Sequence, residues 1–239
     1  MIKRFITPDL SDKRIKWASD YLEGAGFLKA EKAENADFVL LGVNPDRSFL
    51  SYDIPIIAGN VSGSNIFDYT KEEEFAVKNA YLTAEGALSL AISESGKSLI
   101  NSSVLILGYG RIGKALHRYL NAFTARITVC ARRSGAAALA EAAGAATVRF
   151  EDLKGNMNYD FIFNTVPHPV LGSGELYSVK GGALIIDLAS FPGGVDVQLA
   201  DYLKLRLITA RSLPSRYSPA SAGKVVGETA ERIIKEVIL

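Results

Sequence analysis

Strand-sized apolar runs alternate with amphipathic segments along the first part of the chain. Continuous apolar runs of four to six residues are typical of strands that are buried in a parallel sheet. Apolar residues at three- and four-residue spacing, with Ser11 placed as an N-cap, predict helices between such strands. We expect strands at Phe5-Ile6, 38–43 and 55–58, and helices at 11–26, 71–77 and 83–95. This order predicts a small flavodoxin-like α/β domain over residues 1–97.

A polar stretch around Gly96 and Ser102 separates this part from a second series of apolar runs. Six short strands joined by crossovers are what a doubly wound, Rossmann-type parallel sheet requires. The expected strands are 104–107, 127–130, 147–150, 161–163, 184–186 and 205–208. We therefore predict a dinucleotide-binding domain over 98–239. Its last segment, 221–239, carries an apolar stripe and is expected to form a helix that packs back on the N-terminal domain.

A glycine motif follows directly after the first strand of the second series. Residues Gly108, Tyr109, Gly110, Arg111, Ile112 and Gly113 have the GxGxxG spacing and lead into a helical pattern. In this context Gly108 permits a tight turn, Gly110 lets a pyrophosphate approach the backbone N–H groups, and Gly113 lets the helix lie close to the strand. The motif predicts a bound nicotinamide dinucleotide.

The end of the next strand indicates which dinucleotide is bound. A carboxylate about 20 residues beyond the glycine motif would bind the ribose 2′-hydroxyl of NAD. The sequence has Arg132, Arg133 and Ser134 at this place instead. Two guanidinium groups and a hydroxyl can bind a 2′-phosphate by charge-assisted hydrogen bonds, although a solvated arginine pair is the alternative. We predict NADP as the cofactor in preference to NAD.

A third cluster follows the fourth strand of the second series. Strand ends at the switch point of such a sheet face the nicotinamide half of the ligand. We therefore expect the cofactor to be lined by Asn164, Thr165, Val166 and Pro167. His168 could relay a proton there or be an exposed loop residue, whereas His117 is expected on the surface.

Composition narrows the functional classes. The 239 residues contain 27 Lys and Arg against 26 Asp and Glu, so no charge excess favours nucleic acid or a membrane surface. No apolar run reaches the roughly 18 residues of a membrane span, and the N-terminus has no signal-peptide core. One cysteine and two histidines argue against a disulfide framework and a zinc site. We expect a cytoplasmic protein without a metal.

Several linked motifs resemble the family of dipicolinate synthase A subunits. They are Thr83-Ala84-Glu85-Gly86, the glycine motif, Ala131-Arg132-Arg133-Ser134, Asn164-Thr165-Val166-Pro167, Asp187-Leu188-Ala189-Ser190, Pro192-Gly193-Gly194 and Leu213-Pro214. The resemblance covers roughly residues 75–239. The N-terminal region is shorter than in that family, with Thr7-Pro8-Asp9 in place of a Gly-Gly-Asp turn. The chain is thus similar to a divergent or N-terminally shortened member.

The resemblance implies an NADP-linked oxidation of dihydrodipicolinate to dipicolinate, the chelator of the spore core, and so a role in sporulation. It implies a small dicarboxylic substrate, a partner that is a flavoprotein-like B subunit, and Leu188, Ala189 and Ser190 beside the cofactor. An amphipathic last helix is also consistent with a homo-oligomer. The candidate catalytic residues are a helix-end anion site at Thr83, the proton acceptors Glu85 and His168, and the cation Lys224.

Three alternatives stay open. A 2-hydroxyacid-dehydrogenase-like enzyme shares the two-domain plan, but it needs an imidazole–carboxylate pair and an arginine. The sequence has no histidine after His168 and has Ser190, not arginine, after the fifth strand. A non-catalytic NADP(H)-binding subunit fits the scarcity of ionisable groups. A reductase would need a proton donor, for which Tyr81, Tyr217 and His168 are the candidates.

Overall fold

The computed structural model describes residues 3–237 and divides into two compact units, each built on its own parallel sheet. The first unit comprises residues 1–82 and 214–239, and the second comprises 83–213. This division differs from the expected segments 1–97 and 98–239, because the chain enters the second unit within a helix and returns to the first unit for its C-terminal helix. Of the expected last helix, Ile238 and Leu239 lie outside the described residues.

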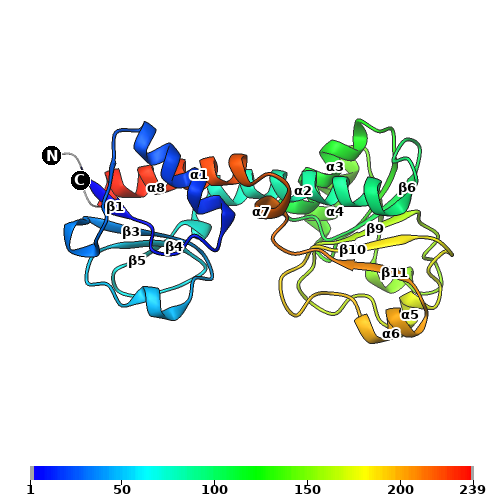
Figure 1. Cartoon of the computed structure of the whole chain (residues 1–239). Coiled ribbons are helices and arrows are strands. Elements are labelled where there is room, and N and C mark those ends of the chain that lie inside the picture. The colour runs from blue at the N-terminus through cyan, green and yellow to red at the C-terminus, as the bar shows by residue number, and fades with distance from the viewer. Residues whose placement is uncertain (1–2, 238–239) are drawn as a thin grey trace. The chain divides into compact units, whose positions relative to one another are not determined.

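The first unit holds a five-stranded parallel sheet of order β2-β1-β3-β4-β5. This is the flavodoxin-like order that the apolar runs predict. Figure 1 shows the helices α1 and α8 side by side along this sheet. The elements are β1 (Arg4–Ile6), α1 (Lys13–Gly24), β2 (Leu28–Lys29), β3 (Phe38–Val43), β4 (Ile56–Gly59), β5 (Ile66–Asp68), the start of α2 (Glu73–Ser95), most of α7 (Leu213–Tyr217) and α8 (Pro219–Val237).

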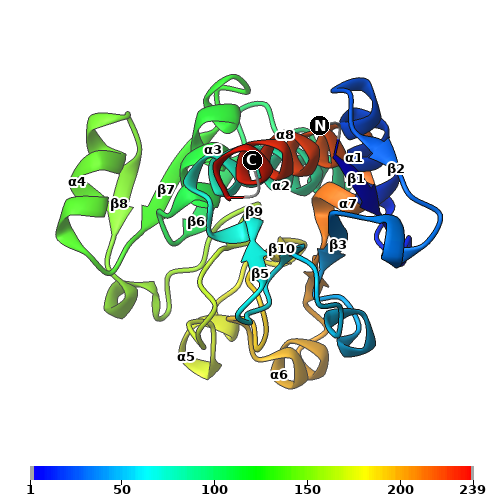
Figure 2. The ribbon, with the colours of Figure 1, turned by 90° about the vertical axis from the view of Figure 1, so that its left-hand side faces the viewer.

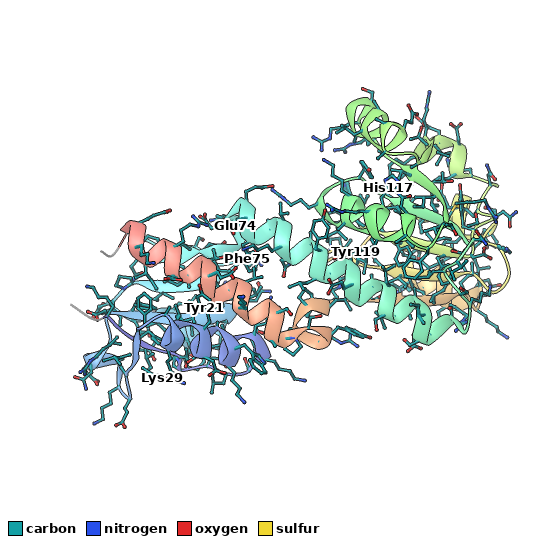
Figure 3. All side chains as sticks on the ribbon, turned by 90° about the horizontal axis from the view of Figure 1, so that it is seen from above. Tyr21, Lys29, Glu74, Phe75, His117 and Tyr119 are labelled. Carbon is teal, nitrogen blue, oxygen red and sulfur yellow. The ribbon has the colours of Figure 1, made fainter. Side chains whose placement is uncertain are left out.

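An apolar cluster joins this sheet to its helices. It brings Phe5 and Phe38 of the strands together with α1, with Phe75 of α2 and with Ile233 of α8. At the same interface the hydroxyl of Tyr21, which is labelled in Figure 3, donates a hydrogen bond of 2.9 Å to a carboxylate oxygen of Glu231. The C-terminal helix is therefore a part of the core of the first unit.

Two helix boundaries differ from those expected. The N-cap of α1 is Asp12, whose carboxylate accepts the N–H of Arg14 at 3.0 Å, whereas Ser11 donates to Asp9. The two helices expected at 71–77 and 83–95 are one continuous helix, α2. The prediction of a break was wrong because the connecting residues 78–82 contain no proline or glycine that would end a helix.

The second unit holds a six-stranded parallel sheet of order β11-β10-β9-β6-β7-β8. When β6 is counted as the first strand, β7 and β8 lie on one side of it and β9, β10 and β11 on the other, which is the doubly wound Rossmann order. The predicted fold class is confirmed. Figure 1 shows α3 on one face of the sheet and α5 and α6 on the other, and Figure 2 shows α4 beside the edge strand β8. The elements are β6 (Ser103–Leu107), α3 (Arg111–Asn121), β7 (Arg126–Cys130), α4 (Ser134–Ala142), β8 (Ala146–Val148), β9 (Phe161–Asn164), α5 (Ser173–Leu176), β10 (Leu184–Asp187), α6 (Val197–Tyr202) and β11 (Arg206–Thr209).

The register of the central strands brings their carboxyl ends to one edge. Leu107 of β6 pairs with Asn164 of β9, which pairs with Asp187 of β10, which pairs with Thr209 of β11. Ligands of doubly wound sheets bind outside this edge, at the point where the strand order reverses. In this sheet the reversal lies between β6 and β9.

Candidate functional site

The glycine loop between β6 and α3 is built for the close approach of a ligand. Gly108 has φ +90°, a conformation that L side chains rarely adopt. A Cβ on Gly113 would lie 2.3 Å from the carbonyl oxygen of Gly108, so only glycine lets α3 begin this close to the loop. A Cβ on Gly110 would meet nothing within 4 Å. The N-cap Gly110 therefore adds no side chain that would keep an anion away from the N-terminus of α3.

A cavity of about 1900 Å³ lies beside this loop, entirely within the second unit. Gly108, Tyr109 and Gly110 line one part of it. The rest of the lining comes from the end of β7 and α4, from the segment 149–154, from the loop after β9 with α5, and from the loop after β10. Of the residues expected at the cofactor, the further ones on its wall are Arg132, Arg133, Ser134, Val166 and Pro167. The glycine cradle and the size of the cavity fit a dinucleotide.

The end of β7 presents its cations to this cavity. Arg132, Arg133 and Ser134 are exposed and line the wall, and Ser134 begins α4. The wall also contains Arg149, whose Nε donates to Glu151 at 3.0 Å. This part of the wall thus carries both cations and a carboxylate, and the arginine pair is separated by one residue from the end of β7, the strand next to β6.

Asn164 and Thr165 hold the loop after β9 against the glycine loop without lining the cavity themselves. The backbone N–H and the hydroxyl of Thr165 both donate to the carbonyl of Leu107, at 2.9 and 2.8 Å. A Cβ on Gly108 would lie 2.6 Å from Oγ1 of Thr165 and 2.9 Å from a methyl carbon of Val166. The loop after β9 therefore packs on Gly108, and a side chain at 108 would push the two loops apart.

Asp187, at the end of β10, is a buried carboxylate to which the sequence motifs assign no role. It is 2% exposed and accepts the side-chain N–H of Asn164 at 2.7 Å. It also accepts the backbone N–H groups of Ala189 and Gly194. The sequence signal that could have found it was a carboxylate that closes an apolar strand beside a Gly-Gly pair, since a buried charge requires partners nearby.

Tyr109 of the glycine loop and His117 of α3 form a pair. The Tyr109 hydroxyl lies 2.7 Å from Nδ1 of His117, and the two rings are 5.7 Å apart. His117, labelled in Figure 3, is 2% exposed, so the expectation of a surface position was wrong. It lies one turn after Gly113 and therefore on the buried face of α3. Burial lowers the pKa of His117 below its ordinary value of 6.5.

The four candidate catalytic residues lie on three segments: Thr83 and Glu85 on α2, His168 in the loop after β9, and Lys224 on α8. Thr83 is buried in the middle of α2, so the expected helix N-terminus at this residue is absent. Glu85 accepts a hydrogen bond of 3.0 Å from the Tyr119 hydroxyl. His168 is exposed on the wall of the cavity. Lys224 belongs to α8 in the first unit, with Nζ 3.9 Å from a carboxylate oxygen of Glu228.

The remaining residues expected at the cofactor do not line the cavity. Arg111, Ile112 and Gly113 form the first turn of α3, and Leu188, Ala189 and Ser190 follow β10. Among residues 3–237 there is no group of three or more His, Cys, Asp or Glu side chains that could hold a metal ion. None of the helices in the described part of the chain is both long and apolar enough to cross a membrane.

Comparison with known proteins agrees with this geometry. The chain is 30% identical over 168 residues to the A subunit of dipicolinate synthase from Bacillus subtilis (strain 168). The matched stretch covers 70% of this chain and 57% of that protein, less than two thirds of the relative's length. The predicted resemblance to the A subunits of dipicolinate synthase is thereby confirmed.

Solved structures show the same fold. The dipicolinate synthase A chain from Bacillus subtilis superposes with a TM-score of 0.85 at 22% identity, covering 99% of this chain and 97% of that chain. The A subunit of dipicolinate synthase from Bacillus halodurans gives a TM-score of 0.81 at 21% identity, covering 97% of both chains. At these identities the superpositions establish the fold.

Residues 76–210 match a family profile described as "D-isomer specific 2-hydroxyacid dehydrogenase, NAD binding domain". This range is more than half of the chain and contains the glycine loop, the arginine pair and the strand ends around the cavity. The second unit thus carries a nicotinamide dinucleotide-binding domain of the dehydrogenase type. The chain belongs to the family of the D-isomer specific 2-hydroxyacid dehydrogenase NAD binding domain.

Proposed function

We propose that the protein is an NADP-dependent oxidoreductase that oxidises dihydrodipicolinate to dipicolinate. The observation that carries the cofactor part is the open cradle at Gly110, next to the exposed Arg132 and Arg133 on the same cavity. The substrate part is supported by the similarity to the A subunit of dipicolinate synthase. NADP is favoured over NAD because the strand after the cradle ends in cations and not in a carboxylate.

Different residues of the chain bind different parts of the cofactor. The N–H groups at the start of α3 bind the pyrophosphate, and the arginines bind the 2′-phosphate. When bound, the nicotinamide would accept a hydride from the substrate carbon. The loops after β9 and β10 then define where the substrate lies, because they line the cavity at the carboxyl ends of the strands that receive the nicotinamide half.

A dicarboxylic substrate needs a cation near this half of the site. Arg211, two residues after β11, supplies one, and its guanidinium donates to the carbonyl of Ala189 in the loop after β10. His168 on the cavity wall is the candidate acceptor for the proton that leaves with the hydride. The product is aromatic, so this proton transfer requires no strong base, and positioning is the main contribution of the protein.

The proposal is tested by calorimetric titration of the chain with NADPH and with NADH. The same preparation is then mixed with freshly generated dihydrodipicolinate and NADP⁺, and dipicolinate is followed by its ultraviolet absorbance. NADPH preference with product above the spontaneous rate supports the whole proposal. NADPH binding without product, even when a flavoprotein-like partner is added, would reject the substrate and favour a non-catalytic NADP(H)-binding subunit. Binding of neither nucleotide would reject the cofactor.

A further inference from the structure

The carboxylate of Asp187 joins the two loops that follow β9 and β10. One oxygen, Oδ1, accepts from Nδ2 of Asn164 at 2.7 Å and from the N–H of Ala189 at 3.2 Å. The other oxygen, Oδ2, accepts from the N–H of Gly194 at 3.1 Å. All three donors are neutral N–H groups, and a carboxylate, which only accepts, matches all of them. Asp187 itself lies behind the cavity wall and does not line it.

Asn164 carries this anchoring into the loop after β9. Its Nδ2 also donates to the carbonyl of Val166 at 3.1 Å, and its Oδ1 accepts the N–H of Val166 at 3.1 Å. A flip of the amide would place donor against donor and acceptor against acceptor, so its orientation is fixed. Val166 lines the cavity and lies against Gly108.

The loop after β10 is held equally closely. Gly193 has φ +96°, and a Cβ on it would lie 2.6 Å from Oδ2 of Asp187. A Cβ on Gly194 would lie 2.3 Å from Nδ2 of Asn164 and 2.7 Å from the carbonyl of Val166. The Gly193-Gly194 pair thus lets this loop close directly on the Asp187–Asn164 pair. Gly193 and the neighbouring Pro192 then form part of the cavity wall.

We propose that Asp187 is a positioning residue that fixes both walls of the nicotinamide end of the site. It acts through Asn164 on the wall after β9 and through the N–H of Gly194 on the wall after β10. The inference rests on the proposed dinucleotide function. In a doubly wound sheet the half that carries the glycine loop and the arginine pair, β6 to β8, binds the adenine side. The half formed by β9 to β11 then receives the nicotinamide.

The substitution Asp187→Asn tests this role with almost no change in shape. Its amide nitrogen must face either the N–H of Gly194 or the two donors at the other oxygen, so one wall loses its anchor. The matched control is Asp160→Asn at the opposite edge of the same sheet. Asp160 accepts the N–H of Ser103 at 3.0 Å and pairs with Lys180 at 2.8 Å, so it is also a hydrogen-bonded carboxylate.

Affinity is measured by calorimetry for the dinucleotide that the unaltered chain prefers, and for ADP as a probe of the adenine half alone. Asp187→Asn is expected to raise the dissociation constant of the dinucleotide about tenfold, the loss of about one hydrogen bond. It should leave that of ADP within about twofold, and Asp160→Asn should leave both unchanged.

The possible outcomes separate the two proposals. Equal losses for ADP and for the dinucleotide would mean that Asp187 merely supports the fold, and no loss for either would also overturn the inference. In both cases the unaltered chain still binds the dinucleotide, so the proposed cofactor stands. An unaltered chain that binds no nucleotide overturns both proposals together.

Discussion

Substitution of Gly110 should weaken dinucleotide binding, whereas substitution of Gly113 should lower the stability of the fold. A side chain at Gly110 points into open space and the backbone there is extended, so Gly110→Val should leave the fold intact. It would, however, fill the place of the pyrophosphate. Loss of one or two hydrogen bonds to a charged group, at about 1.5–3 kcal/mol each, corresponds to at least a ten- to hundredfold weaker binding of NADPH. Gly113→Ala places a methyl group 2.3 Å from the carbonyl oxygen of Gly108. The loop must move by about 1 Å, and such overpacking costs about 1–3 kcal/mol of stability.

The assay is calorimetry with NADPH for binding, and urea unfolding followed by far-ultraviolet circular dichroism for stability. Trp17 is the only tryptophan and lies in the first unit, so its fluorescence does not report directly on this loop. The control is Gly181→Val, where a Cβ also meets nothing within 4 Å but at the opposite edge of the sheet. If Gly110→Val binds NADPH within twofold of the unaltered chain, the motif is only a turn. Equal stability losses at Gly110 and Gly113 would refute the geometric argument.

Three further results are expected. Arg132→Asp combined with Arg133→Ala should weaken NADPH binding much more than NADH binding in calorimetry, and equal losses would remove these arginines from the 2′-phosphate. Burial raises the pKa of the Cys130 thiol to about 12, so at pH 8 a thiol reagent should label it only after unfolding; rapid labelling of the folded chain would contradict this burial. Because burial lowers the pKa of His117, its contribution to stability is complete above pH 6.5 and is lost as the pH falls below that value, by up to about 1.4 kcal/mol per pH unit. In urea unfolding, His117→Gln should reduce the fall in the free energy of unfolding between pH 7 and pH 5. An unchanged fall would mean that His117 does not cause this pH dependence.

The elements that the sequence predicts well are those whose own residues determine them. The run 38–43 is fully apolar because β3 is buried on both faces, and its observed bounds are Phe38–Val43. The glycine loop is also predictable from its own residues, because the turn, the cradle and the close packing of α3 each require a glycine at a fixed spacing. The flavodoxin-like and Rossmann sheets then follow from the order of the strands.

The features that the sequence does not predict depend on residues far away in the chain. The edge strand Leu28–Lys29 has only two residues, both exposed, and it exists because β1 offers it backbone partners. His117 has a polar side chain on a buried helix face, where its Nδ1 lies 2.7 Å from the Tyr109 hydroxyl, and helical periodicity alone does not reveal that contact. Asp187 ends an apolar strand like many loop residues, and its importance becomes visible only when Gly194 folds back upon it.

The return of the chain to the first unit has a consequence for how the protein is made. Synthesis runs from the N-terminus to the C-terminus, so β1 to β5 emerge before the second unit, whereas the helix that completes their core, α8, emerges after it. Val226, Ala230 and Ile234 of α8 are fully buried in that core. The continuous segment 83–213 can complete its sheet during translation. The apolar face of the first sheet that α8 covers stays exposed until α8 has been synthesised. The first unit therefore completes its folding after the second unit. Until then its exposed apolar surface is open to chaperone binding and to aggregation.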